Sequence, residues 1–447
     1  MKTINEKDAV NLLEEAEKLD RDALKKLQNE RLRELVAFVR EASPYFKELY
    51  RDIPEDFTLT DLPPTGKEEL VLRYSDWVTE RGIEKQDVLK HLEGSGPVSL
   101  FAGKYSALHT SGTTGEPMPM LRDSYHNVIH GAMLKRRLLG EFAEFMDVKK
   151  HRRAAVIFTE KGASSYNSYL RTIAANPGYE DNFIVVSTLE PTGKIIKTLD
   201  EFRPEQISGY PSALALLSGA QLDGKMDIHP KMIASSAELM TEDIYYMVKK
   251  AFNCRIVNNY CSTEGGEAAM ACDCPHLHIN EDWVIIEPVD RKGNIIPVDS
   301  DEWSDGILIT DLSNQIQPII RYRMNDSVRI HSKDEGFDNP FFWMEIRGRT
   351  GGVFEFCGHS FLQVYLFKCV ENTSIFTQFI QNSPDEMEIR ILPYEGEDKK
   401  KAFDTIYERF TRFVEEEGCR DYKVLFSDKD LMKNKRGGKA VSYIKNY

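Results

Sequence analysis

Short apolar runs alternate with helix-like segments through the middle of the chain, and this alternation constrains the fold more than any other feature. The runs that read as buried strands lie at 154–158, 183–186, 206–209, 232–234 and 255–257. Helix-like segments lie between them, such as 211–221 and 241–252, the latter with Thr241 as its N-cap. This order predicts an α/β domain with a largely parallel sheet, in which ligands bind beyond the carboxyl ends of the strands.

The regions on either side have their own patterns. Before the alternating region, Leu32, Leu35, Val36 and Val39 form one apolar helical stripe, and Ser43-Pro44 is expected to end that helix. After it, strand-like runs between 282 and 346 predict a β-rich subdomain.

The end of the chain predicts a separate α+β domain. We expect helices at 361–370 and 399–417 and strands at 386–392 and 422–426. The predicted organisation is therefore a large N-terminal domain at 1–348, a hinge at 349–352 that contains Gly351-Gly352, and a small mobile C-terminal domain at 353–447.

Composition excludes several classes of protein. The chain has 447 residues, 58 Lys and Arg and 72 Asp and Glu, so its net charge of −14 argues against nucleic acid as a partner. No apolar run reaches the roughly 18 residues of a membrane-spanning helix, and the first residues lack an apolar leader. We therefore expect a cytoplasmic protein with no membrane partner, and the seven cysteines are expected to be thiols or metal ligands rather than disulfides.

The strongest motif is the segment Thr110-Ser-Gly-Thr-Thr-Gly-Glu-Pro117. Its glycines permit a close approach of the backbone to a ligand, and its hydroxyl and N–H groups can donate hydrogen bonds to phosphate oxygens. It lacks the lysine of the Walker sequence. The alternative interpretation is a polar surface loop.

This loop resembles the phosphate-binding signature of the acyl-adenylate-forming enzymes, in particular the branch of phenylacetate–coenzyme A ligase. Further segments resemble that family in the same order along the chain: Arg31–Tyr50, Ser236-Ala-Glu238, Asn259-Tyr-Cys-Ser-Thr-Glu-Gly265, Ile320-Arg-Tyr-Arg-Met-Asn-Asp326, Gly348-Arg349 and Gly438-Lys439. The resemblance covers almost the whole chain.

The resemblance implies two half-reactions. A carboxylate attacks the α-phosphorus of ATP to give an acyl-adenylate and pyrophosphate, and a thiol, usually coenzyme A, then displaces AMP. Catalysis of this kind depends on positioning and charge neutralisation.

The resemblance also assigns roles to residues. Lys439, Thr263 and Glu264 would be catalytic, with Lys439 reaching the acyl carboxylate, Thr263 the α-phosphate and Glu264 a Mg²⁺ ion. Tyr260 would stack on adenine, Asp326 would accept the ribose hydroxyls and Arg349 would bind nearby. The remaining nucleotide-binding residues would be Ser111, Gly112, Thr113, Thr114, Gly115, Ser236, Ala237, Glu238, Asn259, Cys261 and Ser262.

Each of three roles has a structural alternative. Glu264 could be a solvated turn residue, Asp326 could pair with Arg321 or Arg323, and Lys439 could belong to a solvated basic tail.

The chain departs from the family pattern at several positions. Glu116 replaces a lysine, Met324-Asn325 replaces Thr-Gly, Gly351-Gly352 replaces an acidic pair, and Cys357-Gly-His-Ser360 replaces Arg-Gly-x-Asn. Most of these lie where the C-terminal domain rotates for the second half-reaction, so transfer to coenzyme A is less secure than adenylation.

Cysteines and histidines gather in Cys272-Asp-Cys-Pro-His-Leu-His278. Thiolate and imidazole groups suit tetrahedral Zn²⁺, and we expect Cys254, Cys272, Cys274 and His278 as ligands of a structural zinc, with His276 and Cys261 as alternatives. The other interpretation is reduced thiols and a structural histidine.

These observations predict an ATP-dependent, AMP-forming acid–thiol ligase that uses Mg²⁺ and coenzyme A. One alternative is an adenylating enzyme that passes the acyl group to an amine or a carrier protein, and another is a nucleotide-binding regulator without activity. The sequence leaves open the carboxylic acid, expected to contact residues in 234–237, 258–262 and 158–169, and whether the protein forms a homodimer.

Overall fold

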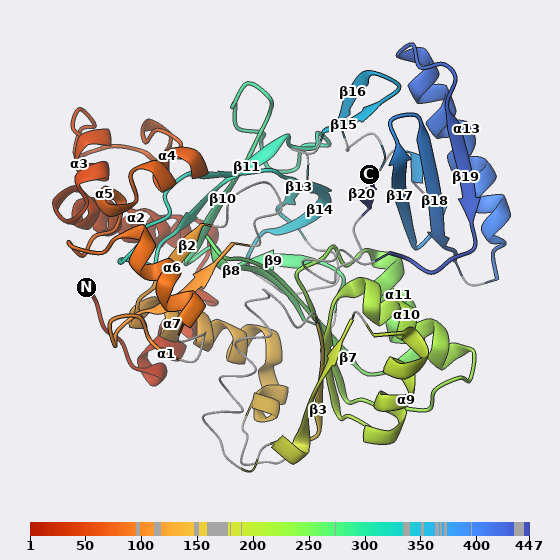
Figure 1. The fold of residues 1–447 in the computed structure, drawn as a ribbon. Coiled ribbons are helices and arrows are strands. Elements are labelled where there is room, and N and C mark those ends of the chain that lie inside the picture. Colours follow the sequence, from red (N-terminus) through yellow and green to blue (C-terminus); the bar gives the residue numbers. More distant parts are fainter. Residues whose placement is uncertain are drawn as a thin grey trace.

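The computed structural model describes most of the chain. The described residues are 1–94, 99–110, 118–146, 152–158, 178, 180–188, 190–272, 274–333, 340–349, 353–362, 366, 369–370, 373–394, 396–432 and 442–447. They form a large unit around one wide sheet and a small unit made by the end of the chain (Figure 1).

The wide sheet has nine strands in the order β13-β14-β9-β8-β7-β6-β5-β3-β4. Its parallel strands are β3 (Ala154–Phe158), β4 (Phe183–Ser187), β5 (Gln206–Gly209), β6 (Met232–Ser236) and β7 (Arg255–Ser262). They agree with the five predicted runs, and all residues of β3 are buried. β7 is longer than the predicted 255–257. Its last residues are polar and only partly buried, so no apolar run in the sequence marked them as part of the strand.

Three helices connect the parallel strands and lie on the same side of them in Figure 1. They are α9 (Thr192–Phe202), α10 (Pro211–Leu222) and α11 (Glu242–Phe252). The Thr241 hydroxyl accepts a hydrogen bond from the Ile244 amide at 3.2 Å, which confirms the predicted N-cap of α11.

Antiparallel strands extend the sheet beyond β7. They are β8 (Gly266–Cys272), β9 (Leu277–Ile279), β14 (Trp343–Arg349) and β13 (Asp326–His331). A separate sheet contains β10 (Val284–Val289), β11 (Gly306–Asp311) and β12 (Tyr322–Met324). The predicted β-rich region is therefore divided between two sheets, and its last two strands belong to the wide one.

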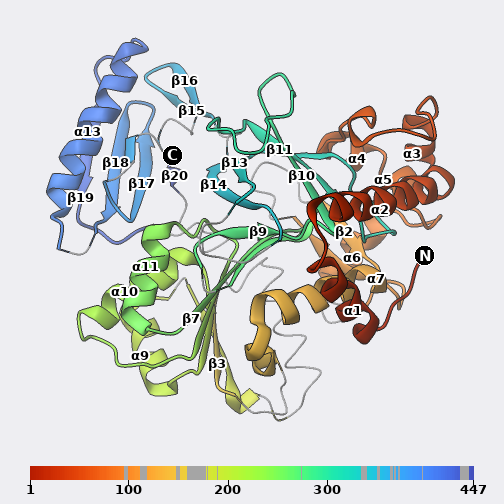
Figure 2. The same cartoon turned by 180° about the vertical axis from the view of Figure 1, so that it is seen from behind.

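The N-terminal helices are α1 (Glu6–Ala16), α2 (Arg21–Ala42) and α3 (Pro44–Leu49). The predicted stripe of α2 is buried, and the helix ends just before Ser43, as expected. The Arg31 guanidinium lies 3.5 Å from the ring centroid of Trp283 and 3.6 Å from the Asp282 carboxylate, which holds α2 against the β-rich part of the large unit (Figure 2).

Shorter elements complete the first third of the chain. They are α4 (Lys67–Leu72), α5 (Tyr74–Trp77), α6 (Lys85–Gly94), β1 (Ser106–His109), β2 (Pro119–Arg122) and α7 (Ser124–Met133). Among the described helices, none has both the length and the apolar character needed to cross a bilayer.

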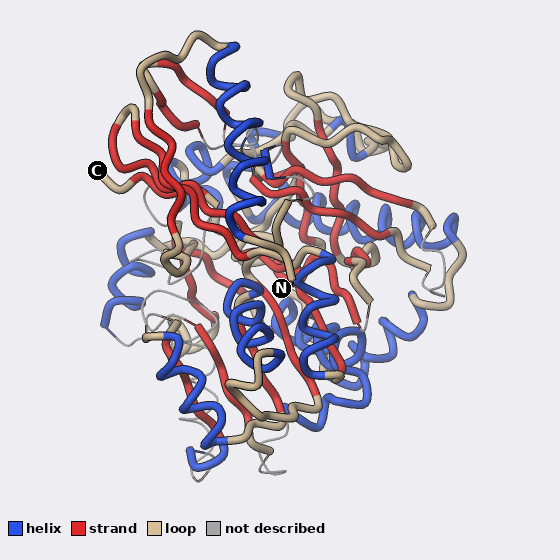
Figure 3. The backbone as a smooth tube through the Cα atoms, turned by 90° about the vertical axis from the view of Figure 1, so that its right-hand side faces the viewer, coloured by secondary structure: helices blue, strands red, loops and turns tan. Residues whose placement is uncertain are grey.

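The small unit contains a four-stranded sheet in the order β19-β18-β17-β20. Its strands are β17 (Phe376–Ser383), β18 (Glu386–Leu392), β19 (Lys423–Ser427) and β20 (Tyr443–Lys445). The helix α13 (Lys399–Glu416) packs on one face of this sheet, and Figure 3 shows it beside the strands. Ile389, Ile406 and Phe410 belong to a hydrophobic cluster formed only by residues of this unit.

The predicted start of the helix at 361–370 is wrong. Phe361 belongs to β16 (His359–Leu362), which forms a hairpin with β15 (Val353–Phe356). Phe361 lies opposite Phe354, and their ring centroids are 5.2 Å apart. This cross-strand contact between aromatic rings stabilises a strand where the apolar spacing indicated a helix.

Candidate functional site

Two predicted nucleotide-binding segments lie on adjacent strands. β6 ends at Ser236 and β7 carries Asn259 and Tyr260, and the register pairs Ser236 with Asn259. Both segments thus lie at the carboxyl ends of parallel strands, where ligands of such sheets bind.

The segment that follows β6 has an unusual backbone. Ala237 is exposed and has a φ of 68°, in the left-handed region that costs a residue with a Cβ about 1–2 kcal/mol. Strain of this kind is typical of ligand-binding sites. The next residue, Glu238, accepts a hydrogen bond from the Ser212 amide at 3.1 Å, so its carboxylate lies at the N-terminus of α10.

The turn between β7 and β8 carries Thr263 and Glu264. The Ser262 hydroxyl accepts a hydrogen bond from the Gly265 amide at 2.8 Å, which closes the turn. Arg122, the last residue of β2, donates from Nη2 to the carbonyl oxygens of Ser262 and Thr263 at 3.0 and 3.2 Å. This contact ties the turn to the segment that follows residues 111–117.

The proposed phosphate loop, Ser111 to Gly115, lies outside the described residues. Its two ends are held together, because the Thr110 amide donates to the Met118 carbonyl at 3.0 Å and the Met118 amide donates to Thr110 Oγ1, also at 3.0 Å. The antiparallel pairing of β1 with β2 continues from this point.

Asp326 and Arg349 lie opposite each other on β13 and β14. Asp326 is buried, and Arg349 is described by its backbone alone. Arg321 pairs instead with Glu287, its Nε and Nη2 donating to the two carboxylate oxygens at 2.9 and 3.1 Å. The alternative in which Asp326 pairs with Arg321 is therefore wrong.

Lys439 also lies outside the described residues, but the structure describes both ends of its segment. The Gln378 side chain of β17 exchanges two hydrogen bonds with the backbone of Met432, at 2.6 and 2.7 Å. The Phe379 amide donates to the Ser442 carbonyl at 2.8 Å. β17 thus holds the residues before and after the segment with Lys439.

The predicted zinc ligands lie on or next to the neighbouring strands β7, β8 and β9. Cys272 pairs with Val257 through the backbone, and His278 pairs with Met270. Cys254 and Cys274 are buried thiols, but they pack in different hydrophobic clusters. Because Cys272 is described by its backbone alone, the zinc site stays a prediction.

The described residues contain one different group with metal-ligand spacing, His126, His130 and Asp311, whose ligand atoms lie within 4.8 Å of one another. Neither this group nor Arg122 was predicted from the sequence. A signal was present, because His126 and His130 are four residues apart and therefore share one face of α7.

Comparisons with known proteins find relatives that match most of the chain. The chain is 24% identical over 408 residues to the protein CapK of Staphylococcus aureus, covering 87% of this chain and 82% of that protein. It is 27% identical over 335 residues to the phenylacetate–coenzyme A ligase of Thermus thermophilus, covering 70% and 67% of the two chains. No protein-family model matches the chain.

Solved structures share the fold. The 2-hydroxyisobutyryl-CoA ligase in the postadenylation state, in complex with an acyl-AMP, has a TM-score of 0.61 at 14% identity, covering 96% of this chain and 91% of that one. The same ligase in its thioesterification state with an acyl-AMP and coenzyme A has a TM-score of 0.52 at 14% identity, with the same coverage. These findings confirm the predicted α/β fold with a small C-terminal α+β unit and the resemblance to the acyl-adenylate-forming superfamily.

Proposed function

We propose that the protein is an ATP-dependent, AMP-forming ligase that activates a small carboxylic acid and transfers its acyl group to coenzyme A. The observation that carries the proposal is the convergence of motifs far apart in the sequence. Ser236 pairs with Asn259, and Arg122 holds the turn that bears Thr263 and Glu264.

The residues then have distinct roles in adenylation. Ser111 to Gly115 bind the β- and γ-phosphates, Thr263 contacts the α-phosphate, and Glu264 would hold Mg²⁺ through carboxylate oxygen. Tyr260 stacks on adenine, and Asp326 accepts hydrogen bonds from the ribose, with Arg349 opposite it. The side chains of Ser236, Glu238, Asn259, Cys261 and Ser262 line or support the nucleotide site.

Each half-reaction forms one bond and breaks another. The carboxylate oxygen of the acid forms a bond to the α-phosphorus of ATP while the bond to pyrophosphate breaks, and Lys439 stabilises the negative charge on both groups. The sulfur of coenzyme A then attacks the acyl carbon, loses its proton, and AMP leaves.

A second candidate keeps adenylation and changes the acceptor. Residues 357–360, which depart from the family pattern, form the turn of the β15–β16 hairpin (357–358) and the first two residues of β16 in the C-terminal unit. In the proposed function this unit takes part in the transfer of the acyl group to the thiol. In the alternative, the acceptor in that step is an amine or a carrier protein instead of coenzyme A.

Pyrophosphate release from ATP, measured with a panel of carboxylic acids, tests the first half-reaction. We expect one class of acid to stimulate release, and addition of coenzyme A to convert single turnover into steady turnover. Release with an acid but no effect of coenzyme A supports the second candidate. No release with any acid supports a regulator that binds nucleotides without activity.

A further inference from the structure

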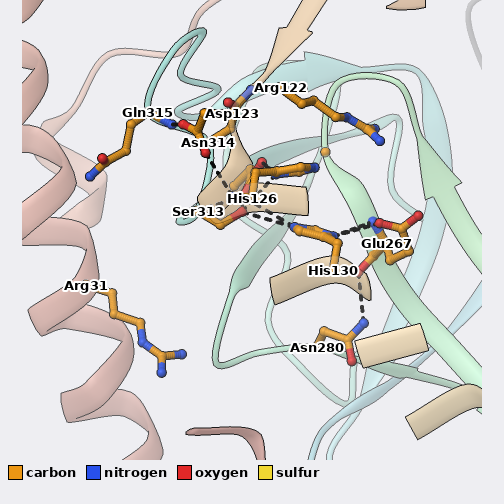
Figure 4. Close-up of polar contacts among 12 residues, drawn as sticks. Arg31, Arg122, Asp123, His126, His130, Glu267, Asn280, Ser313, Asn314 and Gln315 are labelled. Carbon is orange, nitrogen blue, oxygen red and sulfur yellow. Dashed lines mark hydrogen bonds and ion pairs between the residues drawn. The ribbon is translucent and has the colours of Figure 1, made fainter. Parts of the chain in front are cut away.

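A largely buried polar cluster contacts the start of β8, directly after the Thr263–Glu264 turn. It consists of His126, His130, Glu267, Asp311 and Ser313, and we call it the Ser313 cluster (Figure 4). None of these residues belongs to the motifs that bind substrate in the proposed function.

The Ser313 hydroxyl is the centre of the cluster. Its oxygen lies 2.6 Å from Asp311 Oδ1, 2.9 Å from His126 Nδ1 and 3.1 Å from His130 Nε2. A serine hydroxyl has one proton to donate and two lone pairs. It therefore donates to Asp311 and accepts from the two imidazole rings, so all its hydrogen-bonding capacity is used.

This arrangement favours a hydrogen-bond network over a metal site. Two histidines four residues apart with a nearby carboxylate have metal-ligand spacing. However, the nitrogen and oxygen atoms that would bind the ion already converge on Ser313 Oγ, so a metal ion would have to displace that hydroxyl.

His130 makes the contact to the turn. Its Nδ1 lies 2.8 Å from Glu267 Oε2, and the Glu267 amide is 3.0 Å from the same nitrogen. The neighbouring Gly266 has a φ of 64°, and a Cβ there would lie 2.3 Å from His130 Cε1. Glycine at this position therefore lets the imidazole pack directly against the turn.

The charges of the cluster balance when His130 is protonated. Glu267 and Asp311 contribute two negative charges, and His130 and Arg122 contribute the positive ones. Burial would lower the pKa of His130, but its contacts with Asp311 and Glu267 outweigh burial and raise this pKa to about 9. Burial lowers the pKa of His126, which lies next to this cation, to about 4.

The cluster also joins three segments of the proposed site. α7 begins shortly after the phosphate loop, Glu267 follows the Thr263–Glu264 turn, and Asp311 and Ser313 precede the Ile320–Asp326 motif. Asp123, the N-cap of α7, accepts hydrogen bonds from the amides of Gln315 and Ile316 at 2.8 and 3.2 Å.

We infer that His130, held between Glu267 and Asp311, is a positioning residue that fixes the Thr263–Glu264 turn relative to the helix after the phosphate loop. This inference rests on the proposed function, because the turn matters for the reaction only if Glu264 acts in adenylation.

Kinetics of His130→Gln test the positioning role. In pyrophosphate exchange with an active acid, we expect kcat to fall about 10- to 100-fold and the Mg²⁺ concentration for half-maximal rate to rise, with KM for ATP changed less than about threefold. The matched control is His229→Gln, whose side chain is 76% exposed and outside the site, with expected wild-type values. Wild-type kcat and Mg²⁺ dependence in His130→Gln would overturn the inference.

A second variant covers the case in which His130→Gln folds poorly because Glu267 is left as an unpaired buried charge. The double variant His130→Gln/Glu267→Gln removes that charge, so we expect its melting temperature to recover and its kcat to stay low. Recovery of kcat together with stability would show that His130 serves folding alone and would overturn the inference.

Histidine NMR tests the cluster without any activity. In protein labelled with ¹⁵N-histidine, the signals of His130 should show both ring nitrogens protonated at pH 7.5, and His126 should remain neutral at pH 5.5. A neutral His130, or an equivalent of bound metal that is lost in His130→Gln, would overturn the inference. If the wild type is inactive with every acid but the NMR result holds, the proposed function has failed and the protonated cluster has not.

Discussion

Arg321 shows that a residue inside a nucleotide-binding motif can serve the fold. It is buried, it pairs with buried Glu287, and its Nη1 also donates to the Leu62 carbonyl at 2.5 Å. The sequence could not show that Arg321 pairs with Glu287 and not with Asp326. Glu287 lies on β10, and only the tertiary packing brings it next to Arg321. The proposed contact of Asp326 with the ribose therefore does not compete with an ion pair to Arg321.

Glu264 is the residue on which adenylation depends most in the proposed function. Glu264→Gln keeps the shape of the side chain and removes its negative charge, so the contact with Mg²⁺ weakens. We expect pyrophosphate exchange to fall at least ~10²-fold, as when one electrostatic contact is lost from a transition state. Glu302→Gln, at an exposed position in the sequence between β10 and β11, is the control. Adenylation near the wild-type rate in Glu264→Gln would contradict the assignment.

The raised pKa of His130 predicts how the free energy of unfolding depends on pH. Its pKa is about 9 in the folded protein against an ordinary value of 6.5, so between these pH values the folded state holds an additional proton. The contribution of His130 to stability should therefore be fully present below pH 6.5 and be lost as pH rises towards 9, by at most about 1.4 kcal/mol per pH unit.

Urea unfolding of the wild type, His130→Gln and His229→Gln across this range measures the effect. The decrease should be smaller in His130→Gln than in the other two proteins. Parallel curves for all three would mean that His130 does not carry the proton.

At the scale of elements, the predictions from the sequence are correct where an apolar pattern defines a strand or a helix. The buried parallel strands β3 to β7 and the helices α10 and α11 agree with the predictions, because each has a continuous apolar run or an amphipathic face. The β15–β16 hairpin was missed, since the pairing of Phe354 with Phe361 is a contact that no local pattern shows. The Ser313 cluster was missed although His126 and His130 are four residues apart in the sequence, because its other members come from β8 and from the end of β11 and the residues just after it.

The segment between β8 and β9 carries the prediction of structural zinc. Protein purified without a histidine tag should contain about one equivalent of zinc in a closed site of four ligands. Replacing Cys272 and Cys274 together by serine should remove the metal and lower the free energy of unfolding. Replacing Cys369, a buried thiol of the small unit, by serine is the control for zinc content. Metal-free wild-type protein would contradict the prediction.

At the scale of the whole molecule, the small unit contacts the large one at α11. The Tyr394 hydroxyl is 2.8 Å from the Asp243 carboxylate, and Ile375 packs in the hydrophobic cluster of β3 to β7 and their helices. The small unit nevertheless has its own buried core. A unit with its own core can move as a body relative to its neighbour, and the proposed pair of half-reactions would use such a movement.

Lys439 should separate the two half-reactions. The described residues on either side of its segment contact β17 of the small unit, whereas Glu264 and Asp326 belong to the large one. In the proposed function the lysine would therefore reach the acyl phosphate in only one arrangement of the units. Lys439→Ala should therefore slow acyl-adenylate formation severely and leave the reaction of a supplied acyl-adenylate with coenzyme A much less affected. Proline at Gly351 or Gly352 restricts the proposed hinge and should allow one half-reaction while blocking the change between them.

Single-turnover assays of each half-reaction distinguish these effects. Lys445→Ala, in β20 of the same small unit, is the matched control and should leave both half-reactions near wild type. Equal impairment of both half-reactions in Lys439→Ala, or of neither, would contradict both the lysine assignment and the alternation of two arrangements. Selective loss of adenylation would mean instead that this lysine acts before the acyl group meets its acceptor, whichever acceptor that is.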